Sequence, residues 1–146
     1  VAKLFAAIFI TIIPVIAMLK HPSNPLIEHI INLLFNTDGT PANASIFWIT
    51  GLNSSLLDNT PSYLIFFNAV SGDISTFLTT QTQSLRAISA GAVFMGALTY
   101  IGNGPNLMVK SIAEHESIKL PSFFGFIFKY AIPILVPLLI IVGFMM

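Results

Sequence analysis

Two short polar segments interrupt an otherwise apolar sequence, and both carry residues that can bind ions. The first consists of Asp58, Asn59, Thr60 and Pro61, and the second of Gly102, Asn103, Gly104, Pro105 and Asn106. Each has an asparagine followed two residues later by a proline. Carboxylate, carboxamide and backbone carbonyl oxygens can bind Na⁺, and a carboxylate can also carry a proton. The segments therefore predict a cation or proton site, with Asp58, Asn59 and Asn103 as the expected Na⁺ ligands.

Each proline also predicts that a half-helix begins beside it, because a proline in the first turn of a helix costs no hydrogen bond. Thr60 and Asn103 precede the prolines and are candidate caps. The free N–H groups and the dipole of a helix N-terminus attract an anion. The carbonyl groups that end the preceding half-helix attract a cation instead. Secondary transporters use such broken helices to hold an anion together with its coupling cation.

Asp58 is the residue whose placement most needs an explanation. A carboxylate at the centre of a membrane helix costs about 3 kcal/mol, so it requires a cavity, a partner or a proton. We expect Asp58 to bind Na⁺ or to titrate as a proton carrier. The alternative is that it caps the half-helix that starts at Pro61. The two roles are compatible. Asn53, Ser54 and Ser55 lie one turn earlier and are expected to line the same cavity.

The composition places the chain in a membrane. Its 146 residues are 55% hydrophobic and 8% charged, with a mean hydropathy of +0.86. Soluble domains carry about 25% charged residues, so this chain cannot cover its surface for water. A net charge of zero gives no indication of a nucleic-acid partner, and the absence of cysteine excludes disulfides and thiolate metal sites. No pairing of a nucleophile with a base is visible, so we do not expect an enzyme.

Length and patterning then predict the elements that position the two segments. We expect an all-α integral membrane protein that crosses the membrane several times, in a cell membrane of the bacterial inner-membrane type. Residues 1–146 form a single membrane domain with spanning helices at 4–19 and 122–146, an interfacial helix at 25–36, a re-entrant hairpin at 44–72 and a broken spanning helix at 87–113. The first arm of the broken helix is rich in Gly, Ala and Ser, which favour close packing of membrane helices.

The two breaks are expected to share one polar cavity. Backbone groups without partners in lipid cost several kcal/mol each, so breaks survive where protein buries them or where they line a cavity. Basic residues then suggest an orientation. Lys3, Lys110 and Lys119 would share one side of the membrane, and Lys20 and Arg86 the other, which places the first set in the cytoplasm. The hairpin would enter from the outside, where the C-terminus would also lie.

The segments "SSLLDNTPSYLIFFNAVSGD" and "FMGALTYIGNGPNLMVKSIAE" resemble the ion transporter superfamily, in particular its citrate transporter and sodium:proton antiporter-like branch. The superfamily also includes arsenite permeases and sodium-coupled dicarboxylate transporters. Its members contain two inverted repeats, each with a re-entrant hairpin and a broken helix whose tips bind substrate and sodium. The resemblance implies that this chain is the second repeat, the C-terminal half of a longer transporter.

The match to the superfamily motifs is incomplete. Dicarboxylate transporters carry Ser-Asn-Thr at the hairpin tip; here Asn59 and Thr60 match it, and Asp58 replaces the serine. The second segment resembles a Gly-Thr-Pro-Pro-Asn break, matched at Gly102, Pro105 and Asn106. The carboxylate in place of a hydroxyl favours a site centred more on the cation than on a dicarboxylate.

These features predict a secondary active transporter that works by alternating access. It would move a small anion such as citrate, or exchange sodium for protons, with Na⁺ or H⁺ as the coupling ion and no other cofactor. The expected partners are the lipid bilayer, the small anion or cation substrate and the N-terminal half of the same transporter, with a homodimer as a further candidate. The alternatives are an ion channel and a non-transporting intramembrane scaffold. A channel should show a continuous polar stripe, which helices 4–19 and 122–146 lack.

Overall fold

The computed structural model describes residues 2–20 and 24–146, and every regular element within them is a helix. This confirms the all-α fold class. The elements are α1 (Ala2–Lys20), α2 (Pro25–Asn32), α3 (Asn43–Leu57), α4 (Asn59–Val70), α5 (Ile74–Thr79), α6 (Thr82–Met95), the 3₁₀ helix η1 (Gly96–Leu98), α7 (Gly104–His115), α8 (Phe123–Phe126), the π-helix η2 (Ile127–Leu135) and α9 (Val136–Gly143).

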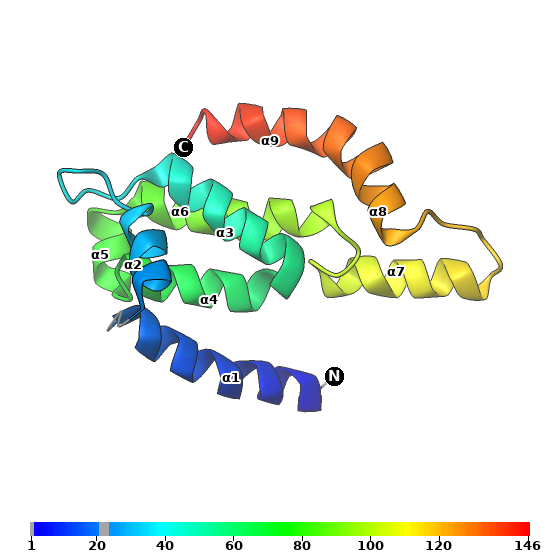
Figure 1. Ribbon diagram of the computed structural model, residues 1–146, viewed down its shortest axis with the longest axis horizontal. Coiled ribbons are helices and arrows are strands. Elements are labelled where there is room, and N and C mark those ends of the chain that lie inside the picture. The colour runs from blue at the N-terminus through cyan, green and yellow to red at the C-terminus, as the bar shows by residue number, and fades with distance from the viewer. Residues whose placement is uncertain (1, 21–23) are drawn as a thin grey trace.

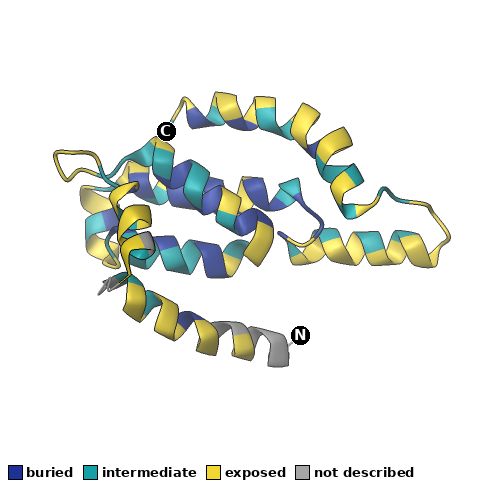
Figure 2. Ribbon diagram, in the orientation of Figure 1, coloured by how far each residue is buried: buried dark blue, intermediate teal, exposed yellow. Residues whose placement is uncertain are grey.

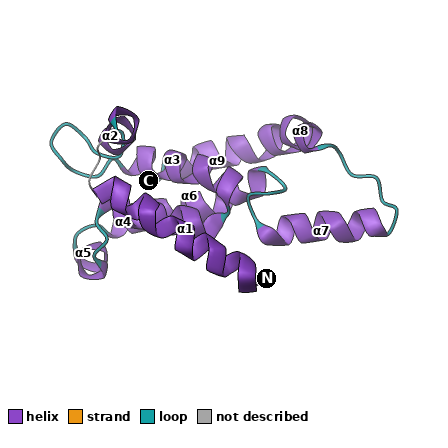
Figure 3. Cartoon of the chain, turned by 60° about the horizontal axis from the view of Figure 1, so that its bottom comes forward, coloured by secondary structure: helices purple, strands orange, loops and turns teal. Residues whose placement is uncertain are grey.

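Helices α3, α4 and α6 contact one another and form the centre of the structure (Figure 1). Helix α1 packs on α4 at one side, and α9 contacts α3 at the other. Buried residues concentrate in the three central helices, whereas α7 and the last helix are largely exposed (Figure 2). Phe47, Ile88 and Met95 are fully buried there. Viewed after a turn of 60°, α2 and α5 lie at one end and α7 extends from the other (Figure 3).

The packing of α3 against α6 depends on a small residue. A Cβ atom at Gly91 would lie 2.4 Å from the carbonyl oxygen of Phe47, closer than real Cβ contacts. Ala87 and Ala92, on the same helix, are also buried. Small residues let the two helix backbones approach, as the composition of this segment predicted. This close approach brings the end of α6 beside the end of α3.

Several element boundaries differ from the sequence prediction, and three of them show a clear local cause or a large shift. Helix α4 begins at Asn59 rather than Pro61, because the Asp58 side chain accepts a hydrogen bond from the Asn59 N–H and occupies the N-cap position. Thr60 is therefore not a cap. Helix α2 ends at Asn32 rather than 36, and a tight turn follows in which Asp38 accepts from the Thr40 N–H. Helix α6 begins at Thr82, five residues before the expected 87.

Asp73, the other acidic residue near the hairpin, caps α5 in solvent. Its carboxylate accepts hydrogen bonds from the backbone N–H groups of Ser75 and Thr76 and from the Thr76 hydroxyl. The hydrogen bonds from Thr76 lower the pKa of Asp73 below its ordinary value. The carboxylate therefore stays ionised at neutral pH, and its contribution to α5 is lost as the pH falls through that lowered pKa.

Among the described residues, one helix is long and apolar enough to cross a membrane: the continuous 21-residue helix Phe123–Gly143, made of α8, η2 and α9. Its π-helical part contains Pro133, which supplies no N–H to the helix. Helix α1 contains Pro14 and a shorter apolar stretch, Ile10–Leu19. That both helices cross the bilayer, and that the hairpin is re-entrant, stay predictions.

Replacement of Gly91 by alanine should destabilise the protein. The added methyl group meets the rigid Phe47 carbonyl, so α3 and α6 must move apart, and such overpacking costs about 1–3 kcal/mol. Thermal unfolding of the purified protein in detergent measures the effect. Gly104→Ala is the matched control, because a Cβ there would meet nothing within 4 Å. Equal melting temperatures for the two variants would show that the α3–α6 contact does not need the glycine.

Candidate functional site

The Asn59 side chain joins the two polar segments. Its carboxamide is surrounded by hydrogen-bond acceptors, so its nitrogen must be the atom that faces them. In this orientation the nitrogen lies 2.8 Å from the Ala92 carbonyl oxygen, 3.1 Å from that of Gly102 and 2.9 Å from the Ser54 hydroxyl oxygen. The Ser54 hydroxyl in turn donates to the Ala92 carbonyl at 2.5 Å. One asparagine therefore connects the hairpin tip, helix α6 and the second break.

Thr99 makes a second connection between the segments. Its hydroxyl donates to the Ser55 carbonyl oxygen at 2.5 Å and accepts from the Gly102 N–H at 2.9 Å. From the first turn of α7, the Asn106 carboxamide donates to the carbonyl oxygens of Gly96 and Thr99, both at 3.4 Å. Both breaks are thus held together by side chains that satisfy main-chain groups left unpaired where the helices stop.

Glycine is required at two positions of this contact. A Cβ atom at Gly102 would lie 2.8 Å from the carbonyl oxygens of Ser55 and Gly96 and 2.9 Å from that of Ser54. A Cβ at Gly96 would lie 2.2 Å from the Asn59 carboxamide. At Gly104, by contrast, a Cβ would meet nothing within 4 Å. The close approach falls at Gly96 and Gly102 because these two face the hairpin.

Four helix ends lie at the contact between the hairpin tip and the second break. Helices α3 and η1 end there, and α4 and α7 begin there, at Asn59 and Gly104 (Figure 1). Pro61 and Pro105 both lie in the first turn of their helices, where a proline removes no helical hydrogen bond. The positive ends of two half-helices are therefore next to the carbonyl ends of two others. Such a site offers N–H groups to an anion and carbonyl oxygens to a cation.

Asp58 sits at the hairpin tip in a strained conformation. Its backbone has φ 85° and ψ 157°, a region occupied almost exclusively by glycine, which costs about 1–3 kcal/mol in other residues. The half-buried Asp58 side chain accepts a hydrogen bond from the Asn59 N–H at 2.6 Å. The backbone carbonyl of Asp58 accepts one from the Ser62 hydroxyl at 2.8 Å. The capping role considered from the sequence is thus present. A role in binding Na⁺ or a proton stays a prediction.

Some of the other predicted site residues are buried in the contact between the two breaks, and the rest are partly or fully exposed beside it. Ser54 is fully buried and Ser55 nearly so, and both take part in the hydrogen bonds. Asn53 and Asn103 are half-buried, and Asn103 caps α7 without a side-chain hydrogen bond. Thr60 and Pro105 are exposed. Asn59 and Asn103 both stay candidate Na⁺ ligands, but their side chains differ in how far they are already used. The Asn59 nitrogen already donates to three oxygens, whereas the Asn103 side chain makes no cap hydrogen bond.

Two hydroxyl groups of this region were not predicted. Thr99 lies three residues before Gly102, and a hydroxyl so close to a helix break could have suggested a role in satisfying it. Thr50 lies one turn before Ser54, is fully buried, and has no hydrogen-bond partner for its hydroxyl among the described residues. The carbonyl groups of Ala92 and Gly96 could not be identified, since every residue carries one.

Asn59→Asp should disrupt the contact between the two breaks. The substitution preserves shape but turns an oxygen toward the oxygens of Ala92, Gly102 and Ser54, leaving buried acceptors unpaired. We expect a loss of about 2–4 kcal/mol in the free energy of unfolding. Thr60→Ala, at the exposed neighbouring position, should change it by less than about 0.5 kcal/mol. Thermal melting and amide hydrogen exchange at Gly102 check this; equal stability of the two variants would contradict it.

Comparison with known proteins identifies the family. No curated protein and no solved structure matches the chain. A family model described as "Putative citrate transport" matches residues 1–146. The match confirms the resemblance carried by the hairpin tip and the second break. The chain therefore belongs to the putative citrate transport family, a citrate transporter-like member of the ion transporter superfamily.

Proposed function

We propose that this protein is a secondary active transporter that moves citrate, or a related small carboxylate, across a cell membrane by alternating access. Membership of the family supports a membrane transport protein in general. The coupling ion in this proposal is Na⁺ or H⁺, and it is cargo rather than a resident cofactor. The bilayer surrounds the protein, and the N-terminal half of the transporter supplies the other part of the site.

The observation that carries the proposal is the meeting of the four helix ends. The first turn of α7 can offer an N–H group to a carboxylate of the substrate, because free N–H groups and the helix dipole favour negative charge; in α4 the Asn59 N–H is already bonded to Asp58. The carbonyl ends of α3 and η1 lie beside these N-termini, and carbonyl oxygens suit a cation. A cation bound next to an anion lowers the cost of holding either one away from water.

A second candidate function is the exchange of Na⁺ for H⁺, and Asp58 favours it. Its carboxylate is half-buried at the tip, and no basic side chain pairs with it in the part of the chain that the structure describes. A carboxylate without a fixed positive partner can exchange a proton for a sodium ion. In this alternative the cations themselves are the substrates, and the half-helix N-termini bind no carboxylate.

Uptake into proteoliposomes that contain the full-length protein separates these functions. A Na⁺ gradient and a pH gradient are imposed separately, and uptake of radiolabelled citrate and movement of protons are measured. We expect one of the two gradients to drive citrate above its external concentration, which a channel or a scaffold cannot do. Proton movement driven by Na⁺ without citrate uptake would favour the exchanger. Citrate that equilibrates but never accumulates would refute coupled transport.

Asp58→Asn should abolish coupling to the ion that this carboxylate binds. Asparagine caps helices as well as aspartate does and has the same shape, so it adds no backbone strain beyond that of Asp58 and the hairpin should remain folded. We expect gradient-driven uptake to fall by at least about tenfold, the loss typical when one charged group of a site is removed. Asp73→Asn is the matched control, because Asp73 is an exposed cap of α5 outside the tip. Unchanged Na⁺ and H⁺ dependence in Asp58→Asn would remove Asp58 from the mechanism.

A further inference from the structure

A cleft of about 660 Å³ lies between α7, the connection that follows it and the start of the last helix. This volume is within the range of about 300–1,000 Å³ common for small-molecule sites. The lining combines two lysines, one amide, three aromatic rings and small apolar groups; the polar and aromatic members are Lys110, Lys119, Asn106, Tyr100, Phe126 and Tyr130. Asn106 also takes part in the contact between the two breaks.

One wall of the cleft is a stack of aromatic rings. The ring centroids of Tyr100 and Phe126 are 4.3 Å apart, and those of Phe126 and Tyr130 are 6.4 Å apart. The Tyr100 hydroxyl donates to the Pro121 carbonyl at 3.4 Å, which joins the connection to the segment between η1 and α7. The wall is apolar apart from its two phenol hydroxyls. A ligand that fits it must carry apolar groups.

The positive charges of the cleft come from α7 and the connection. The Lys110 ammonium lies 5.5 Å from the centre of the Tyr100 ring, and Lys119 lies in the connection opposite. Two ammonium groups near one site favour an anion. Citrate has three carboxylates, a hydroxyl and only two methylene groups, so it would leave most of the aromatic wall unmatched. An anionic amphiphile matches both the charge and the wall.

We propose that this cleft binds the headgroup of an anionic phospholipid from the surrounding bilayer, with its phosphate at Lys110 and Lys119 and its glycerol and first acyl carbons against Tyr100, Phe126 and Tyr130. The last helix continues the apolar path, since Ile134, one turn beyond Tyr130, is 58% exposed. In the orientation expected from the basic residues, both lysines face the cytoplasm, where the leaflet surface is anionic. This site does not depend on which substrate the transporter carries.

Glu114 opposes the lipid at this site. Its carboxylate accepts from the Lys110 ammonium at 2.5 Å, and its side chain is more exposed than that of Lys110. An exposed ion pair of this kind contributes little, so an incoming phosphate can displace it. Removal of the carboxylate should therefore strengthen lipid binding, whereas removal of the lysines should weaken it. These opposite signs distinguish a charge-based site from a general disturbance of α7.

The test is native mass spectrometry of the full-length protein released from nanodiscs of equimolar phosphatidylglycerol and phosphatidylcholine. We expect wild type to retain phosphatidylglycerol preferentially. Each lysine near an anionic lipid contributes roughly a fivefold affinity, so Lys110→Gln with Lys119→Gln should lower phosphatidylglycerol binding about 30-fold and leave phosphatidylcholine unchanged. Glu114→Gln should raise it about twofold.

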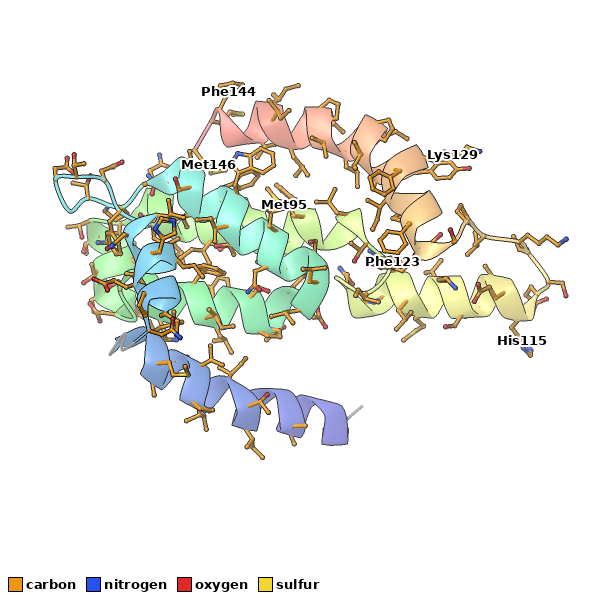
Figure 4. All side chains as sticks on the ribbon, in the orientation of Figure 1. Met95, His115, Phe123, Lys129, Phe144 and Met146 are labelled. Carbon is orange, nitrogen blue, oxygen red and sulfur yellow. The ribbon has the colours of Figure 1, made fainter. Side chains whose placement is uncertain are left out.

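Arg86→Gln is the matched control. Arg86 is an exposed basic residue of α6 that does not line the cleft. Lys129 (Figure 4) is less suitable, because its ammonium lies 5.8 Å from the centre of the Tyr130 ring. Arg86→Gln should bind phosphatidylglycerol as wild type does, and the melting temperatures of all variants should agree. Equal losses in Arg86→Gln and in the double variant would overturn the proposal. It would also fail if glycerol phosphate, which lacks acyl chains, or citrate competed as well as the lipid does.

Discussion

The structure depends on the pairing of main-chain groups that are exposed wherever a helix stops inside apolar surroundings. Each unpaired carbonyl or N–H costs free energy in such surroundings, and this chain interrupts its helices twice. Asn59 and Thr99 resolve this by donating from one break to carbonyl groups at or near the other. Because each break satisfies its partner, neither can open without leaving polar groups of the other unpaired. The hairpin tip and the second break therefore behave as one unit.

The same pairing determines where the outer helices lie. Gly102 is held against the end of α3, so α7, which begins two residues later, must extend away from the central helices (Figure 2). The chain then returns through the connection at 116–122 to the last helix, which contacts η1 through η2. The cleft between α7 and the last helix is a consequence of this route. The tip contact and the cleft are thus neighbouring features that follow from one packing constraint and share Asn106.

The sequence predicts the breaks better than it predicts their partners. Proline and glycine mark where helices stop, so the two segments and the helices around them could be located from residue types alone. The start of α4 could not, because Asp58 adopts a positive φ that its residue type disfavours, and the helix therefore begins two residues before Pro61. Gly96 and Gly102 look no different in the sequence from Gly104, which needs no close approach. Only the packing of α3 on α6 selects which glycines and carbonyl groups meet.

Asp58 shows why capping and ion coupling need not be alternative roles. The Asp58 carboxylate accepts from the Asn59 N–H at 2.6 Å, and a charged acceptor binds roughly twice as strongly as a neutral one. A cation bound at this carboxylate, as proposed above, would weaken this bond at a residue whose backbone is already strained. The first turn of α4, which includes Asn59, would then be held less firmly. Asn59 also donates to the Gly102 carbonyl in the second break. An ion bound at Asp58 would therefore weaken the contact between the hairpin tip and the second break.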